Sequence, residues 1–296
     1  MQEEGGPVSA SQLKIHVRPQ LKNTRMILGL SGWMDGGDVS TGTIECLVTK
    51  LQAGDLAEMQ PEDFYLYSFP GPMEVSAMFR PYCRIEDGMI REFQPASNTF
   101  HYDEANSLIL FKGKEPNFRW RDYADCVFAV ASEFDVKEIY FIGSVAGVVP
   151  HTRKPRLFSS ISLEPMKRRL AAYGVRFSNY AGPASVATFM TTVAAERGLP
   201  MATLVAEIPA YIQGRNPRCI EAVMRHLAAV LDLQIHLDDL RTVSDAFERR
   251  LNELVAKRPE LAELIRKLES DYDSEIFDTQ MGDLKDWLQE QGIRLD

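Results

Sequence analysis

The residue types best suited to chemistry stand together between Gly143 and Arg153, in the order Gly-Ser-Val-Ala-Gly-Val-Val-Pro-His-Thr-Arg. The two glycines free the backbone, so that its N–H groups can approach an anion. A titratable ring, a hydroxyl and a cation follow within three residues, in His151, Thr152 and Arg153. The segment comes directly after Glu138 to Ile142, which is predicted to be a buried strand. Ligands bind beyond the carboxyl ends of strands in open α/β sheets, so we expect a pocket here. The alternative is an ordinary connection with solvated charges.

Four side chains are the candidates for catalysis. Ser144 does not match the Gly-x-Ser-x-Gly nucleophile elbow, because the order here is Gly-Ser-Val-Ala-Gly. With Asp35 as the acid and His151 as the base, Ser144 could still complete a catalytic triad, which is the weaker alternative. Glu207 could act as a general base or accept a hydroxyl, or it could be a buried carboxylate paired with Arg153 or Arg215. These residues leave open whether the protein is an enzyme.

A second glycine-rich loop, Gly32 to Asp38, follows another predicted strand. Its Gly36-Gly37 pair could cradle a phosphate at the start of the next helix. The loop matches neither dinucleotide-binding nor P-loop spacing, and its two aspartates disfavour an anion. Asp38 is expected to cap the helix that begins at Val39.

Three further loops each follow a predicted strand, at Phe69–Pro72, Tyr180–Ser185 and Glu207–Tyr211. If the sheet is parallel there, all of them reach the same edge as the first segment. The predicted ligand-binding set is Gly36, Gly37, Gly71, Gly143, Ser144, Gly147, His151, Thr152, Arg153, Gly182, Glu207 and Tyr211.

Neither a metal nor a cofactor is expected. The five histidines include no pair at i, i+4, and no Cys-x-x-Cys occurs. The four cysteines are far apart in the sequence, so we expect reduced and mostly buried thiols.

Strands and helices alternate over residues 119–231, which predicts a largely parallel sheet with helices on both faces. Phe64 to Phe69 and Val175 to Asn179 are among the predicted strands. Two hairpins should add antiparallel strands; the first turns at Asp87-Gly88. Asn216 is expected to cap a helix that has Pro217 at its first position.

The composition changes near residue 235, where Glu, Arg, Leu, Asp and Lys become dominant. Helical stripes begin at Leu237 and again after Pro259, and a last short helix is expected around Leu284 to Leu288. We therefore expect two units, an α/β domain over residues 12–234 and a helical extension over residues 235–296. A helical hairpin docked on the sheet is preferred over an arm reserved for other proteins.

The chain has 296 residues and a net charge of -9. That balance argues against a nucleic-acid partner and against anionic membranes. The polar, acidic first residues lack the pattern of a signal peptide, and no apolar stretch approaches the length of a membrane span. Cytoplasm is the expected location.

The Gly143–Arg153 string resembles the PAC2 family, as do Gly32–Gly37, the Phe-Pro-Gly-Pro at Gly71 and Glu207–Tyr211. The chain is most similar to the bacterial branch, which carries a helical C-terminal extension. The resemblance implies a three-layer α/β/α sandwich of the phosphorylase/hydrolase type and a homo-oligomer, for which a trimer is expected. Chaperone members dock on the proteasome through a C-terminal hydrophobic-Tyr-x motif. The last residues, Ile293 to Asp296, lack that tyrosine.

Two functions follow as hypotheses. The first is an oligomeric assembly or interaction protein with a protein partner, chaperone-like, and with a potential small-molecule pocket at the loop edge of the sheet. The second is a small-molecule enzyme of hydrolase or nucleoside-phosphorylase type that acts on a nucleoside or phosphate-bearing substrate. An assembly protein should expose a large apolar patch, whereas an enzyme should have a deep pocket at Gly143–Arg153.

Overall fold

The structure is a computed structural model that describes residues 12–77 and 79–290. Its centre is a nine-stranded mixed sheet in the order β1-β3-β6-β7-β2-β8-β11-β9-β10. The expectations for the first eleven residues and for the C-terminal tetrapeptide lie outside the described residues. The strands of this sheet are β1 Leu13–Ile15, β2 Thr24–Ser31, β3 Gly54–Met59, β6 Thr99–Asp103, β7 Leu108–Lys114, β8 Val136–Gly147, β9 Leu157–Ser159, β10 Arg176–Phe177 and β11 Met201–Pro209.

Four neighbouring strands, β7, β2, β8 and β11, run parallel and form the centre of the sheet. On one side β6, β3 and β1 continue the sheet antiparallel, and on the other side β9 pairs antiparallel with β11. Because the central strands are parallel, their carboxyl ends meet at one edge of the sheet. We call this the loop edge. The sequence predicts the mixed sheet with a parallel centre correctly.

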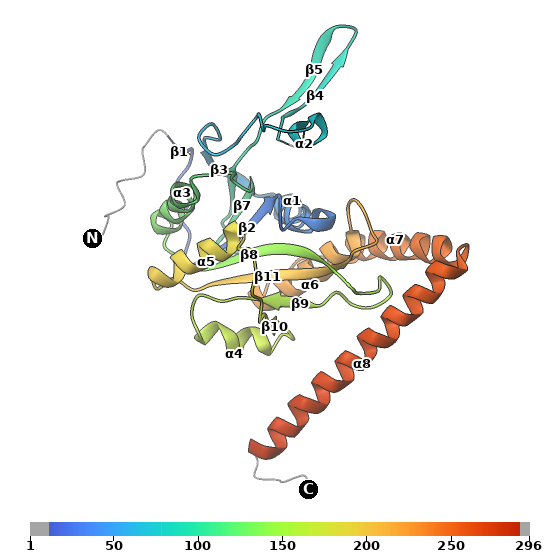
Figure 1. The fold of residues 1–296 in the computed structure, drawn as a ribbon. Helices are drawn as coiled ribbons and strands as arrows, with labels where there is room; N and C mark the ends of the chain where they lie inside the picture. The colour runs from blue at the N-terminus through green and yellow to red at the C-terminus, as the bar shows by residue number, and fades with distance from the viewer. Residues whose placement is uncertain (1–11, 78, 291–296) are drawn as a thin grey trace.

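Helices cover both faces of the sheet (Figure 1). One hydrophobic cluster joins α3 and α5 to one face, and another joins α1, α4 and α6 to the opposite face. The helix α7 packs on α6, and α8 follows it. The bounds of these helices are α1 Val39–Leu51, α3 Trp120–Glu133, α4 Pro165–Ala171, α5 Val186–Glu196, α6 Pro217–Leu231, α7 Asp238–Ala256 and α8 Pro259–Glu290.

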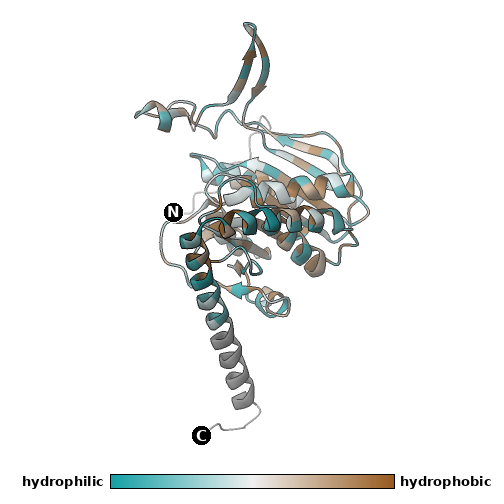
Figure 2. Ribbon diagram, turned by 90° about the vertical axis from the view of Figure 1, so that its right-hand side faces the viewer, coloured by the Kyte–Doolittle hydropathy of each residue, from teal (hydrophilic) through white to brown (hydrophobic). Residues whose placement is uncertain are grey.

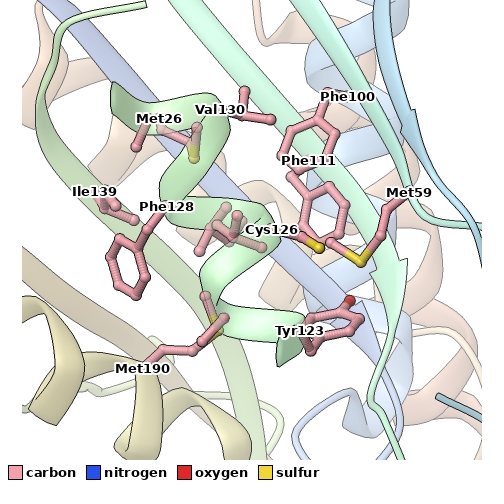
Figure 3. Close-up of a cluster of buried hydrophobic side chains, with 14 of the residues drawn as sticks. Met26, Met59, Phe100, Phe111, Tyr123, Cys126, Phe128, Val130, Ile139 and Met190 are labelled. Atoms are coloured by element: carbon pink, nitrogen blue, oxygen red, sulfur yellow. The ribbon is translucent and has the colours of Figure 1, made fainter. Parts of the chain in front are cut away.

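The core on the α3 face combines aromatic rings with aliphatic and methionine side chains (Figure 3). The rings of Phe100 and Phe111 stack with centroids 4.2 Å apart, and Tyr123 meets Phe111 edge-on at 6.2 Å. Val127 and Val130 lie on the same helical face as Tyr123 and are also buried. Each such side chain contributes about 1.5–3 kcal/mol when it leaves water.

The structure differs from the predicted elements in three places. Phe64–Phe69 is not a strand: Phe64 is buried from a turn, and the strand lies earlier, at β3. β10 has only two residues, fewer than the predicted Val175–Asn179. α8 runs unbroken to Glu290, so the separate short helix predicted around Leu284 to Leu288 is wrong. The polar residues of β3 interrupt its apolar pattern, which explains why the sequence did not predict it.

Residues 60–98 leave the loop edge between β3 and β6 and form a projecting segment. This segment holds the short helix α2, Met73–Ala77, and a separate hairpin of β4, Tyr82–Glu86, and β5, Met89–Gln94. The predicted turn at Asp87-Gly88 is correct, and both residues have positive φ, 49° and 76°. The hairpin stands away from the rest of the molecule (Figures 1 and 2).

Candidate functional site

Ser144 lies inside β8 with no exposed surface. Its backbone N–H donates to Met34 O at 2.8 Å, and its hydroxyl donates to Gly36 O at 2.6 Å. The side chain therefore ties the Gly32–Asp38 loop to the central strand. The hydroxyl is committed to Gly36 O and has no exposed surface for a substrate to reach, so its position fits a structural role.

Asp35, not Asp38, caps helix α1. Its carboxylate accepts from Ser40 N at 2.8 Å, from Thr41 N at 3.1 Å and from the Thr41 hydroxyl at 2.7 Å. The side chain of Asp38 makes no capping hydrogen bond. Burial raises the pKa of Asp35 to about 6, against the hydrogen bonds that favour its charge. Two of the N–H groups at the start of α1 thus already bind a carboxylate.

Gly36 and Gly37 serve the packing of this loop. A side chain at Gly36 would meet Ile208 Cδ1 at 2.7 Å. Gly37 has φ 66°, in the left-handed region that favours glycine, and its carbonyl accepts from Asn216 N at 2.7 Å. Asn216 in turn caps α6, as the sequence predicts, by accepting from Cys219 N at 3.1 Å. The loop after β2 is thereby joined to the start of α6.

His151 is buried, with only 2% of its surface exposed. The hydroxyl of Tyr211 accepts from His151 N at 2.7 Å and lies 2.8 Å from His151 Nδ1. His151 Nε2 lies 3.0 Å from Asn252 Oδ1, on α7. These contacts fit a neutral ring that accepts at Nδ1 and donates from Nε2. Burial lowers the pKa of His151, which favours the same form.

Thr152 and Arg153 point at α8. The Thr152 hydroxyl donates to Glu269. Arg153 donates from Nε and Nη2 to the two carboxylate oxygens of Asp273, both at 2.8 Å, and its Nη1 lies 3.3 Å from Glu269 Oε1. The backbone carbonyl of Lys154 accepts from the Tyr272 hydroxyl at 2.8 Å. The anion that Arg153 binds is therefore supplied by the chain itself.

Glu207 pairs with Arg156, at 2.8 Å between Oε2 and Nε, and not with either arginine that the sequence proposed. Both side chains are nearly buried. Arg156 also contacts Glu275 and stacks over the ring of Tyr272, with its Cζ 5.0 Å from the centroid. The carboxylate of Glu207 packs against Gly147, where a Cβ would lie 2.2 Å from Oε1. This close approach explains the glycine.

Four of the five loops meet at the loop edge. The Gly143–Arg153 segment joins the Glu207–Tyr211 loop through Ala210 N and Gly147 O at 3.1 Å. Glu115, just after β7, accepts from Trp33 N at 2.7 Å and from Val186 N at 3.4 Å, and so links the Gly32 and Gly182 loops. Gly71 lies apart in the projecting segment, and no contact described joins it to the other four loops.

The space beside His151 is too small for a substrate. The cavity bounded by Val149–Pro155, Glu207, Asn216 and Arg218 is about 10 Å³, room for at most one water. A larger, open cleft of about 460 Å³ lies elsewhere, between the base of the projecting segment and the ends of β2 and β7. Asp35 is the one catalytic candidate that lines it.

The sequence did not single out the residues that close the Gly143–Arg153 segment, namely Arg156, Asn252, Glu269, Tyr272, Asp273 and Glu275. A signal was present in the i, i+4 spacing of Glu269 and Asp273, beside an apolar stripe that includes the buried Ile265 and Leu268. That spacing is also typical of a solvated helix face. Within residues 12–77 and 79–275, no group of three His, Cys, Asp or Glu side chains is arranged to hold a metal ion.

The fold and the closed loop edge define an α/β/α protein whose own C-terminal helices cover the place where such sheets usually bind ligands. A family model for the PAC2 family matches residues 29–255, and the chain belongs to that family. The comparison with curated proteins gave no match. Among the described helices, none is long and apolar enough to cross a membrane.

Solved structures support the same placement. A proteasome-assembly chaperone homologue of Mycobacterium tuberculosis is 28% identical, with a TM-score of 0.71 over 82% of this chain and 100% of its own. A Mycobacterium tuberculosis protein of unknown function is 19% identical, with a TM-score of 0.81 over 96% and 95%. An archaeal proteasome activator of Pyrococcus furiosus is 18% identical, with a TM-score of 0.62 over 82% and 97%. The last two likenesses concern the fold alone.

Proposed function

We propose that this chain is a chaperone-like assembly protein that binds other proteins and acts as a homo-oligomer in the cytoplasm. One observation carries the proposal. Of the twenty large hydrophobic side chains exposed among the described residues, ten fall between residues 66 and 93. Exposed apolar surface of this density is typical of protein–protein contacts. The ten are Leu66, Tyr67, Phe69, Met73, Val75, Tyr82, Ile85, Met89, Ile90 and Phe93.

The closed loop edge supports the same function. His151, Arg153 and Glu207 each already have partners within the chain, and about 10 Å³ remains beside them. An enzyme that used these residues would need a pocket that holds its substrate. His151 and Arg153 instead bond to Asn252 on α7 and Asp273 on α8. Glu207 holds Arg156, which in turn contacts Glu275 on α8.

The descriptions of two relatives suggest a class of partner. The Mycobacterium tuberculosis protein is described as a proteasome-assembly chaperone homologue, and the Pyrococcus furiosus protein as an archaeal proteasome activator. Applied to this chain as a proposal, these descriptions make proteasome subunits the first partner to test.

The test is co-expression of the chain with the proteasome α-subunits of its own source, followed by affinity capture and native mass spectrometry. A complex is expected with the natural chain. The substitution Met73→Gln should weaken the complex, because it removes apolar surface from the proposed contact. Met73 is 82% exposed, so the change should leave the fold intact. Val243→Gln, on α7 and 52% exposed, is the matched control and should bind as the natural chain does. Failure to capture any α-subunit would contradict the proteasome-related role.

A second candidate function, a small-molecule-binding enzyme, is favoured by the cleft of about 460 Å³. There Asp35, with a pKa of about 6, could exchange protons near neutral pH. Lys112 and Arg215 line the same cleft, although both are held by Glu45, at 2.7 Å and 3.1 Å. Lys114 also lines the cleft, with its Nζ 5.6 Å from the centre of the Tyr65 ring, and could bind an anion.

A thermal-shift comparison with inorganic phosphate and nucleosides would test this candidate. It is supported if one of them raises the melting temperature of the natural chain but not of Lys114→Ala, with the exposed Lys257→Ala as control. No shift with any probe would count against it.

A further inference from the structure

The open cleft of about 460 Å³ lies where the hairpin β4–β5 joins the body of the molecule. Two runs of the chain form one side of it: residues 79–82, at the start of β4, and residues 94–97, at the end of β5 (Figure 1). The other side consists mainly of the ends of β2 and β7 and the first turns of α1. The volume is within the range of about 300–1,000 Å³ in which proteins bind small molecules. A ligand in the cleft would touch both the projecting segment and the main sheet.

The projecting segment contributes aromatic rings to the cleft, those of Tyr67, Phe79 and Tyr82. Tyr82 is 54% exposed and Tyr67 is 43% exposed, so both rings can contact a ligand without leaving a packed core. The ring of Phe79 is stacked on Phe69, with 5.1 Å between their centroids, which holds it in place. Aromatic rings favour another flat ring through offset or edge-to-face packing. These side chains therefore favour a ligand with a planar ring.

The charged side chains of the cleft favour an anion, although the chain as a whole has a net charge of -9. Three carboxylates line the cleft, those of Asp35, Asp38 and Glu45. Four cations outnumber them, namely Arg80, Lys112, Lys114 and Arg215. A cleft with this balance concentrates anions on a protein whose overall charge repels them.

Two of the three carboxylates are already engaged within the chain. Glu45 binds Lys112 through Oε1 at 2.7 Å and Arg215 through Oε2 at 3.1 Å. Asp35 accepts three hydrogen bonds from the start of α1. Both oxygens of Glu45 thus face cations other than Lys114.

Lys114 is the cation best placed to bind an anion in the cleft. It is the last residue of β7 and is half-buried, and its Nζ lies 5.6 Å from the centre of the Tyr65 ring. Burial lowers the pKa of Lys114, because the amine has lost part of its hydration. An anion would offset that loss. The hydroxyls of Ser31 and Ser97 line the same cleft and can donate to the oxygen atoms of the anion.

We infer that the cleft binds a small molecule that carries both an aromatic ring and a carboxylate or phosphate, with the ring against Tyr67 and Tyr82 and the anion at Lys114. The inference rests on the second candidate function, for which it names the class of ligand. An inorganic anion alone would leave the aromatic side of the cleft unfilled. An uncharged ring would leave the amine of Lys114 without a counter-charge. A molecule with both groups satisfies both sides.

Isothermal titration calorimetry on the full chain tests the requirement for two groups. The probes are AMP, with adenosine and inorganic phosphate as its fragments, and 4-hydroxyphenylacetate, with phenol and acetate as its fragments. At least one of the two ring-bearing anions should bind about tenfold more tightly than either of its fragments. Preference for AMP would identify a phosphate ligand, and preference for 4-hydroxyphenylacetate a carboxylate ligand. If neither binds more tightly than its fragments, the inference is overturned.

Variants test the two sides of the cleft separately. Lys114→Gln should weaken binding of the ring-bearing anion about tenfold, whereas Lys257→Gln, at the end of α7, should not change it. Tyr82→Ser should weaken binding about fivefold, and Tyr82→Phe, which keeps the ring, should bind as the natural chain does. Tyr173→Ser, 39% exposed after α4, is the control for removal of an exposed tyrosine. Unchanged affinity in either Lys114→Gln or Tyr82→Ser, with melting temperatures that match the natural chain, would overturn the inference.

Amide exchange locates the bound molecule. A ring-bearing anion at saturation should slow exchange in residues 79–82 and 94–97, which form one side of the cleft. Residues 150–156, beside the small cavity at His151, should exchange at the same rate with and without it. Protection of residues 150–156 in place of the two runs would put the ligand elsewhere and overturn the inference.

The outcomes separate this inference from the functions proposed above. A ring-bearing anion that binds in the cleft but gives no product signals in NMR spectra would contradict the enzyme candidate and leave the inference supported. A compound that is converted at the same rate by Lys114→Gln, Tyr82→Ser and the natural chain would support an enzyme and overturn the inference. Capture of proteasome subunits is tested with Met73→Gln, which lies outside the cleft lining, so its failure leaves the ligand site unaffected.

Discussion

Arg153 and Asp273 form a bidentate ion pair, with 2.8 Å from Nε to Oδ1 and 2.8 Å from Nη2 to Oδ2. The contact joins the loop after the central strand to a helix that begins more than a hundred residues later. Such parallel hydrogen bonds fix orientation as well as distance. The cation expected to bind a ligand thus orients α8.

The first prediction concerns this contact. Asp273→Asn should loosen α8 against the sheet, with faster amide exchange over residues 265–275 and little change in the melting temperature.

Arg153 holds the pKa of Asp273 below its ordinary value. The folded-state pKa is depressed, so the contribution is present at neutral pH and is lost as the pH falls through that lowered pKa. Asp271→Asn is the control, because no contact described for Asp271 involves its side chain. Equal exchange in both variants would contradict the prediction.

The second prediction is a loss of stability on acidification caused by His151. Burial depresses its folded-state pKa below the ordinary 6.5, so the unfolded chain binds the proton first. Stability should therefore fall as the pH drops below about 6.5. Arg218 also disfavours the charged ring, whereas Asn252 and Glu269 favour it.

His151→Gln tests this effect by urea unfolding at a series of pH values. The variant should lose about 1 kcal/mol at neutral pH, because one hydrogen bond to Tyr211 or Asn252 is broken. Its stability should then depend less on pH between about 7 and 5 than that of the natural chain. His226→Gln, on α6 and outside the segment, is the control for removal of a histidine. Parallel pH profiles for the natural chain and His151→Gln would rule out the titration of His151 as the cause.

The third prediction has the opposite sign. The folded-state pKa of Asp35 is about 6, above the ordinary 3.8, so the native state binds the proton first. Between these values stability should rise as the pH falls. Asp35→Asn should remove that trend and keep the cap of α1, since an amide oxygen can still accept from Ser40 N. Asp35→Ala should cost about 1 kcal/mol through the lost cap.

The measurement is best made in the His151→Gln background, where the opposing titration is absent. Urea unfolding of the single and double variants gives the contribution of Asp35 by difference. If Asp35→Asn leaves the pH profile unchanged, the raised pKa is wrong.

The sequence could predict the local elements and the central sheet, because each depends on neighbours in the chain. Asp87-Gly88 specifies a tight turn by its backbone preferences alone, and Asn216 with Pro217 specifies the start of α6. β3 was missed because Asp55 and Glu58 interrupt its apolar pattern, although Leu56 is buried. There the burial is decided by α3 and by the neighbouring strands.

The chemistry of the loop edge was less predictable, for a physical reason. A histidine and an arginine after a strand have the same pattern whether they face a ligand or a helix. Whether His151 and Arg153 face a ligand or a helix depends on where Asn252 and Asp273 lie. The sequence contains no information on the distance between residues so far apart in the chain. The convergence of the loops after β2, β8 and β11 follows from the parallel centre of the sheet. The loop after β10 does not follow from it, because β10 is parallel to β9 and β9 is antiparallel to β11. The partners of the converging side chains do not follow from it either.

The last prediction concerns Gly147, where the close approach of Glu207 leaves no room for a methyl group. In Gly147→Ala the new Cβ would lie 2.2 Å from Glu207 Oε1, so the carboxylate must move away from Arg156. The move separates a nearly buried ion pair, and the crowding itself should cost about 1–3 kcal/mol. Urea unfolding should show this loss.

Gly174→Ala offers a comparison, because a Cβ there meets nothing within 4 Å and only its φ of 75° is unfavourable. Glu207→Gln combined with Gly147→Ala should lose less than the two single changes added together, because both act on the same contact. Additive losses would show that Gly147 and the Glu207–Arg156 pair stabilise the fold independently.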